Sequence, residues 1–167
     1  MMSRLLITLL RVSLSLWVGG AILYVVTSVA EQRHSAFDSS IRDQLAAVRF
    51  PLYYIYCWMT LGVACAAAVS LTLAPGPRSK SLLLVTTVCC LSMAFAIYDY
   101  FRVYLPLLQL ITPPGKARTQ DFERLHDLSR QINELHLSLA AIAAVVASFC
   151  TLQASQHSRS LENTPSN

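Results

Sequence analysis

The sequence has few charged residues and lacks the common motifs of catalytic sites. Only 13% of its residues are Asp, Glu, Lys or Arg, against about a quarter in soluble domains. It contains no G-x-S-x-G, no H-E-x-x-H and no glycine-rich phosphate-binding loop, so no motif indicates a hydrolase, a zinc peptidase or a nucleotide-binding protein. The net charge of +4 comes without a dense Lys/Arg patch, and we therefore expect no nucleic acid partner.

The five cysteines and four histidines also lack the spacings that metal and redox sites need. No C-x-x-C pair is present, and every cysteine lies in an apolar run, where Cys packs as a small hydrophobic residue. The alternative, a redox pair at Cys89 and Cys90, is disfavoured because adjacent cysteines close a strained ring. No histidine lies inside an apolar run, which argues against a haem held by paired histidines in a membrane. We expect no cofactor, no metal site and no enzymatic activity.

Long apolar runs dominate the rest of the chain. The residues AVILMFWYC make up 54% of it, and the mean hydropathy is +0.49. Four runs, at about residues 10–30, 52–74, 81–105 and 137–155, approach the roughly 20 residues that a helix needs to cross a bilayer. They show no strand-like alternation, and in lipid only helices and closed barrels satisfy the backbone. The sequence predicts an all-α fold, a four-helix transmembrane bundle in a single domain over residues 1–155. The last helix extends beyond the membrane as an amphipathic segment, and a disordered polar tail follows at 156–167.

The segments around these runs allow more than one interpretation. Residues 28–30 resemble a signal-peptide cleavage site, but the apolar run before them is longer than a signal usually has, which favours an uncleaved span. Residues 39–48 have apolar positions at helical spacing and could form a short interfacial helix. Pro51 then suits the first turn of the second span. Tyr53 and Tyr54, near its start, are typical of an aromatic belt at a membrane surface.

The helix that begins near Asp121 carries most of the candidate chemistry. Between an apolar stripe and a charged face runs a neutral polar line at helical spacing, formed by His126, Ser129, Asn133 and His136. Either this line faces a cavity and binds a ligand, or its residues cap and bond neighbouring loops; both interpretations stay open. The two histidines lie about 15 Å apart along a helix, too far to share one metal ion without other ligands.

One acidic residue, Asp99, lies towards the end of the third apolar run. Asp99 and Arg102 are spaced i,i+3 near the end of the third run, and they form a candidate ion pair at the membrane interface. Because the spans otherwise lack acidic residues, a proton relay through the membrane has little support. Small residues four apart, such as Gly62, Ala66 and Ser70, offer smooth faces for close contact with other helices.

These features predict a multi-pass integral membrane protein, located in the inner cell membrane if it is bacterial. The favoured role is that of a non-catalytic membrane partner, an assembly component or a regulatory component. Its partners are then the lipid bilayer and, through the small-residue faces, other membrane proteins or a second copy. The alternative is a component of a small-molecule or ion transporter that uses the His126/Ser129/Asn133 line. Both termini are expected on the cytoplasmic side, because the density of basic residues in the short loop with Arg78 and Lys80 favours it, although a raw Lys/Arg count favours the other side.

Several short motifs occur together in a recognisable order. They are Trp17-Val18-Gly19-Gly20, Arg49-Phe50-Pro51-Leu52-Tyr53-Tyr54, Tyr104-Leu105-Pro106 and Phe122-x-x-Leu125-His126-x-x-Ser129-x-x-x-Asn133. In this combination the chain resembles the four-helix membrane family of transmembrane protein 205 and its bacterial relatives, a domain of unknown function. The resemblance extends from the first span to about Val146 and implies an integral membrane domain without established catalytic residues. The chain departs from the family after its first span, where Val29-Ala30-Glu31 replaces a common Ala-Pro and Phe.

Overall fold

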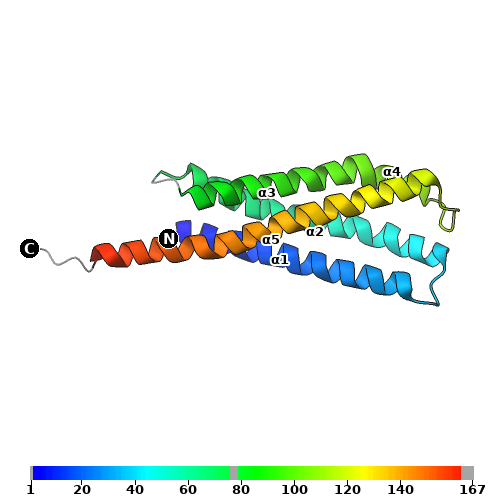
Figure 1. The fold of residues 1–167 in the computed structure, drawn as a ribbon, viewed down its shortest axis with the longest axis horizontal. Helices are drawn as coiled ribbons and strands as arrows, with labels where there is room; N and C mark the ends of the chain where they lie inside the picture. The colour runs from blue at the N-terminus through cyan, green and yellow to red at the C-terminus, as the bar shows by residue number, and fades with distance from the viewer. Residues whose placement is uncertain (1, 76–78, 163–167) are drawn as a thin grey trace, which may run out of the picture.

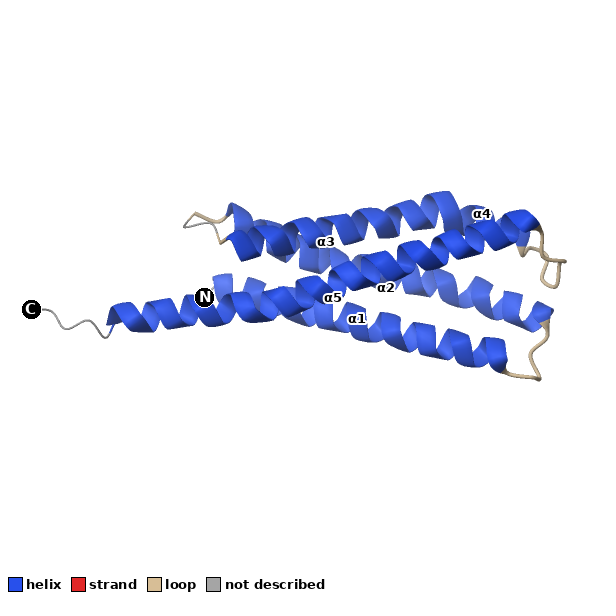
Figure 2. Cartoon of the chain, viewed as in Figure 1, coloured by secondary structure: helices blue, strands red, loops and turns tan. Residues whose placement is uncertain are grey.

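Four long helical rods lie side by side in the computed structural model, and rods that follow one another in the chain are antiparallel (Figures 1 and 2). The structure describes the backbone of residues 2–75 and 79–162 and the side chains of residues 2–75 and 79–149. These residues contain no strand. The elements are α1 (Met2–Arg33), α2 (Ser39–Leu73), α3 (Lys80–Asp99), the π-helix η1 (Tyr100–Tyr104), α4 (Leu105–Leu110) and α5 (Gln120–Glu162). Helices α1, α2 and α5 are the first, second and fourth rods, and α3, η1 and α4 together form the third.

All four rods are long and apolar enough to cross a membrane. At 1.5 Å per residue, α1 is about 48 Å long, whereas the hydrocarbon core of a bilayer is about 30 Å thick. The rods therefore extend beyond the apolar layer. Large apolar side chains are exposed along every rod, from Leu5 to Val29 on α1 and from Leu128 to Phe149 on α5, as expected for a surface that faces lipid. The predicted all-α four-helix transmembrane bundle is confirmed.

The second rod differs from its prediction, because residues 39–48 do not form a separate interfacial helix. Helix α2 runs without a break from Ser39 to Leu73, with Pro51 in its interior. The Asp38 side chain caps its first turn by accepting a hydrogen bond of 2.9 Å from the Ile41 N–H. A proline removes a single backbone donor from a helix, and the turns on both sides of Pro51 are held by the rest of the bundle. The helix therefore continues through it.

The third rod changes its geometry directly after Asp99. The five residues of η1 form a π-helix, in which the Leu105 N–H donates to the Tyr100 carbonyl five residues earlier. Pro106 follows at the start of α4. Because its ring crowds the carbonyl four residues before it and it lacks an N–H, the wider π turn lets the rod pass this proline. π-helical turns occur often at functional sites, which draws attention to this region.

The interior of the bundle is aromatic in one half and filled with small residues in the other. Trp17 and Tyr54 are among the largest buried side chains. In the other half the rods approach one another through six buried alanines: Ala64, Ala67, Ala68, Ala140, Ala143 and Ala147. Small residues let membrane helices pack closely. These alanines bring the rods together inside the bundle, whereas Ala66 and Ser70 of the predicted contact face are exposed.

The backbone of α5 is helical as far as Glu162, past position 156, where the predicted polar tail begins. Side chains after Phe149 and all of residues 163–167 lie outside the described part of the chain. The predicted tail at 156–167 therefore stays a prediction. In Figure 1 the last turns of α5 extend past the ends of the other rods, on the side where the N-terminus also lies.

Candidate functional site

A carboxyl group is enclosed at the centre of the aromatic half. Asp99, at the end of α3, is fully buried, and one of its oxygens, Oδ2, accepts three hydrogen bonds. Tyr54 Oη donates from α2 at 2.5 Å, and Asn133 Nδ2 and Ser129 Oγ donate from α5 at 2.8 and 3.2 Å. The other oxygen, Oδ1, has no partner among the described residues. The carboxyl group thus joins three of the four rods.

Asn133 links this carboxyl group to a second set of polar side chains. Its Oδ1 accepts a hydrogen bond of 2.9 Å from Tyr53 Oη and lies 3.1 Å from His136 Nε2. Because Asn133 Nδ2 donates to Asp99, its Oδ1 must be the acceptor, which assigns the hydrogen of His136 to Nε2. His136 is fully buried and stacks on Trp17 of α1, with ring centroids 5.5 Å apart. All four rods therefore contribute to one network, which we call the Asp99 network: Trp17, Tyr53, Tyr54, Asp99, Ser129, Asn133 and His136.

The structure brings together three residues of the predicted polar line and separates the fourth. Ser129, Asn133 and His136 join the Asp99 network. His126 stays exposed and stacks on Phe122 instead, with ring centroids 5.6 Å apart. It lies seven residues before Asn133, about 10 Å along the helix, and therefore beyond the level of Asp99.

The predicted ion pair between Asp99 and Arg102 is wrong. Asp99 forms no salt bridge with any described residue, and Arg102 is exposed. The i,i+3 argument assumes a regular α-helix, but Arg102 lies within the π-helix, where each turn takes more residues. The two side chains consequently leave the rod in different directions.

Sequence reasoning did not identify Tyr53 and Tyr54 as site residues. It interpreted them as part of an aromatic belt, but both are buried, and their hydroxyl groups donate into the network. Adjacent tyrosines near the end of a span are typical of a membrane surface. Their partners lie 45 and 80 positions away in the chain, so no local pattern indicates this role.

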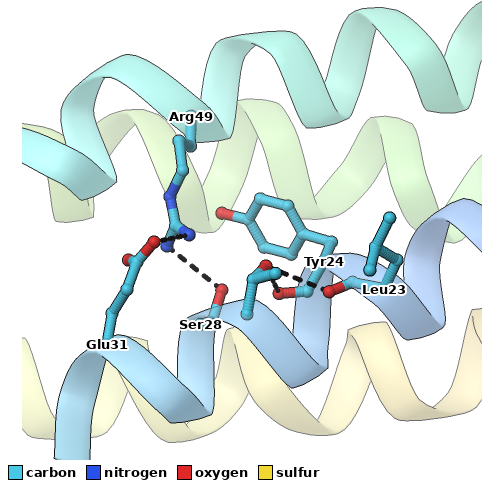
Figure 3. Close-up of polar contacts among 6 residues, drawn as sticks. Leu23, Tyr24, Ser28, Glu31 and Arg49 are labelled. Atoms are coloured by element: carbon cyan, nitrogen blue, oxygen red, sulfur yellow. Dashed lines mark hydrogen bonds and ion pairs between the residues drawn. The ribbon is translucent and has the colours of Figure 1, made fainter. Parts of the chain in front are cut away.

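A charged cavity of about 300 Å³ lies at the end of the bundle where α1 meets α2 and α4 meets α5. One wall contains an ion pair between Arg49 Nη1 and Glu31 Oε1 at 2.5 Å. Figure 3 shows the Arg49 side chain reaching from α2 to Glu31 and Ser28 on α1. The Tyr24 ring lies beside Arg49, 5.3 Å from its guanidinium carbon, and its hydroxyl group points towards Arg49 (Figure 3).

The cavity and the Asp99 network are neighbours. The Tyr24 ring lies 4.5 Å from that of Tyr53 between centroids, and Tyr53 donates to Asn133. Towards the opposite end of the bundle, the buried side chains beyond the network are mostly apolar or small, among them Cys57, Leu61 and Val85. The polar groups of the network therefore continue towards the cavity end.

This arrangement has the chemistry of a site for a proton and lacks that of a metal centre. No group of three or more His, Cys, Asp or Glu residues within the described ranges could hold a metal ion. A buried carboxyl group without a cationic partner is costly to keep ionised in an apolar interior, and its hydrogen-bond donors offset part of that cost. Addition of one proton neutralises it.

Comparison with known proteins identifies no relative of this chain. No family model, no curated protein and no solved structure matches it. The resemblance to the transmembrane protein 205 family therefore stays a prediction.

Proposed function

We propose that this multi-pass membrane protein is a non-catalytic component of a transport system and that Asp99 binds and releases a proton. The observation that carries the proposal is the fully buried carboxyl group, which forms no salt bridge with any residue of the described chain. Acidic side chains inside membrane spans are rare, and they commonly mark ion pathways and proton relays. The predicted alternative, a transporter component that uses the polar line, is thus favoured over a purely structural role.

The two carboxyl oxygens have separate tasks in this proposal. Oδ2 accepts the three hydrogen bonds, while Oδ1 has free lone pairs. A proton that adds to Oδ1 converts the carboxylate to a carboxylic acid and leaves the three donors on Oδ2. Asp99 can therefore change its charge without loss of the contacts that hold α2, α3 and α5 together.

The proton reaches Asp99 from the cavity end. Tyr24, Tyr53 and Asn133 lie between the cavity and Asp99, whereas the buried side chains towards the other end are mostly apolar or small. A single arrangement of the rods thus gives access from one side. Release on the opposite side needs a second arrangement, and the π-helix beside Asp99 is the element best placed to adjust.

Proton movement into vesicles tests this proposal. Wild-type protein is reconstituted into liposomes that contain a pH-sensitive dye, and the interior is followed after an acid jump outside, with the membrane potential clamped. We expect faster acidification than in protein-free vesicles, and we expect Asp99→Asn to abolish the difference. Asp127→Asn, which alters an exposed acid on α5 outside the Asp99 network, should behave as wild type. Equal rates for Asp99→Asn and wild type would contradict the proposal.

We also propose the lipid bilayer and a second membrane protein, or a second copy of the chain, as partners. The support is that Ser15 and Gly19 of α1 face outwards, and that a methyl group added at Gly19 would meet no atom within 4 Å. Small residues on an outer face let another helix approach closely. Gly19→Leu should therefore reduce self-association or partner recovery in lipid nanodiscs, with Leu16→Ala as the control on the same helix. An unchanged assembly state would contradict the proposal that another helix packs against Ser15 and Gly19.

A further inference from the structure

The cavity at the end of the bundle contains one arginine more than its acidic partners neutralise. Three arginines and two carboxylates line it: Arg42, Arg49, Arg118, Glu31 and Asp43. Arg49 pairs with Glu31, and Arg118 Nη2 pairs with Asp43 Oδ1, each at 2.5 Å. The side chain of Arg42 forms no hydrogen bond or ion pair with any residue in the described ranges, and its Nε is buried without a partner.

The other two arginines are also covered by aromatic rings, whereas no ring of the described residues covers Arg42. The guanidinium carbon of Arg49 lies 5.3 Å from the Tyr24 ring centroid, and that of Arg118 lies 4.2 Å from the Phe122 ring centroid. Cation–π contacts of this kind satisfy part of a guanidinium charge. Arg42 therefore differs from the other two in charge pairing and in stacking, although all three line the same cavity.

The acidic residue next to Arg42 in the chain already has a partner for each of its carboxylate oxygens. Asp43, next to Arg42 in the chain, has a side chain only 3% exposed. Its Oδ1 is paired with Arg118, and its Oδ2 accepts a hydrogen bond of 2.9 Å from the Gly115 N–H. Because Gly115 and Arg118 both lie in the connection between α4 and α5, Asp43 fixes that connection over the cavity and is unavailable to Arg42.

Of the eight remaining residues that line the cavity, five are apolar, and Ser28, Gln32 and His126 are polar. The apolar residues are Ala46 and Phe50 from α2, Leu107 from α4, Ile111 from the start of the α4–α5 connection, and Phe122 from α5. A guanidinium group offers paired N–H donors that match the two oxygens of a carboxylate or a phosphate. An apolar wall beside such a donor suits a ligand with a hydrophobic body, and a volume of about 300 Å³ lies at the small end of ligand pockets.

We propose that this cavity binds a monovalent oxyanion with a small apolar body, with Arg42 as its counter-ion. The ligand is either a soluble carboxylate or the headgroup of an anionic lipid, since both present an oxyanion beside an apolar group and the cavity lies at the end of the apolar surface. The site goes beyond the proposed proton function, because no residue of the Asp99 network lines it.

Binding of benzoate to the purified protein in a non-ionic detergent tests whether the ligand is a soluble carboxylate. Arg42→Gln is expected to weaken binding by about tenfold or more, because it removes a charge-assisted hydrogen bond. Ala46→Leu should weaken it similarly by filling the cavity without changing its charge. Arg124→Gln, at an exposed arginine of α5 that does not line the cavity, should bind as wild type does. Inorganic phosphate, which lacks an apolar body, should bind more weakly than benzoate.

A second experiment tests whether the ligand is the headgroup of an anionic lipid. Nanodiscs of phosphatidylcholine with and without phosphatidylglycerol are compared by the thermal stability of the embedded protein. If the anionic lipid stabilises wild type but not Arg42→Gln or Ala46→Leu, and benzoate does not bind, the ligand is a lipid headgroup and the site is supported. The inference is overturned if neither probe distinguishes these two variants from wild type. Asp99→Asn should bind both probes normally, so failure of the proton function and failure of the anion site are separate results.

Discussion

Asp99→Ala is expected to lower the free energy of unfolding by about 3 kcal/mol, since it removes the acceptor of three hydrogen bonds between helices. Tyr54, Ser129 and Asn133 all donate to Asp99 Oδ2. Asn133 Nδ2 also reaches the Ser129 carbonyl at 2.8 Å, so the loss falls mainly on Tyr54 and Ser129. Asp99→Asn keeps an acceptor oxygen of the same shape, so its effect should be nearer to about 1 kcal/mol. Reversible unfolding in mixed micelles measures both values.

One outcome would contradict this expectation. Removal of a buried ionisable group also removes its desolvation cost, and apolar replacements of buried charges are sometimes neutral or stabilising. An Asp99→Ala protein as stable as wild type would mean that the three hydrogen bonds do no more than offset that cost. Asp127→Ala serves as the control, because Asp127 is exposed and its pairing with Arg130 at 3.4 Å is also exposed. It should change stability by less than about 0.5 kcal/mol.

Trp17→Ala is expected to destabilise the bundle by about 3 kcal/mol, in the range for loss of a large buried aromatic side chain. Trp17 is fully buried, stacks on His136 and lies 5.3 Å from the Tyr53 ring between centroids. Its removal leaves a cavity beside both residues. Because lipid is as apolar as the protein interior, the loss comes from packing and not from transfer out of water.

The neighbouring residue provides a matched control for this prediction. Leu16 precedes Trp17 on α1 but is 53% exposed on the outer surface. Leu16→Ala should cost less than about 1 kcal/mol, because a side chain that faces lipid loses few protein contacts. If Leu16→Ala and Trp17→Ala destabilised the protein equally, the orientation of α1 in the bundle would be incorrect. Trp17→Phe should recover part of the lost stability by refilling the space.

The spans and the fold class were predictable because they depend on local composition. A run of apolar residues of bilayer length indicates a membrane helix without any knowledge of its neighbours. The start of α2 is not predictable in this way, because a proline at position 51 indicates the beginning of a helix and the Asp38 cap lies thirteen residues before it. A proline is compatible with both positions, and the packing of the whole rod decides between them.

The candidate site was predictable only in part. Helical spacing grouped Ser129, Asn133 and His136 correctly, because all three lie on one face of one regular helix. The same argument failed for Asp99 and Arg102, where a π-helix intervenes. Tyr53 and Tyr54 depend on contacts between rods that are distant in sequence, and helical periodicity carries no information about such contacts.

A measurement of whether Asp99 takes up a proton is the most direct test of the proposed function. Infrared difference spectra between acidic and neutral pH, recorded in lipid nanodiscs, distinguish a carboxylic acid from a carboxylate. We predict a carboxylic acid band that appears on acidification, is absent from Asp99→Asn and persists in Asp127→Asn. A spectrum in which Asp99→Asn and wild type show the same bands at every pH would mean that Asp99 never exchanges a proton, and it would contradict the proposed function.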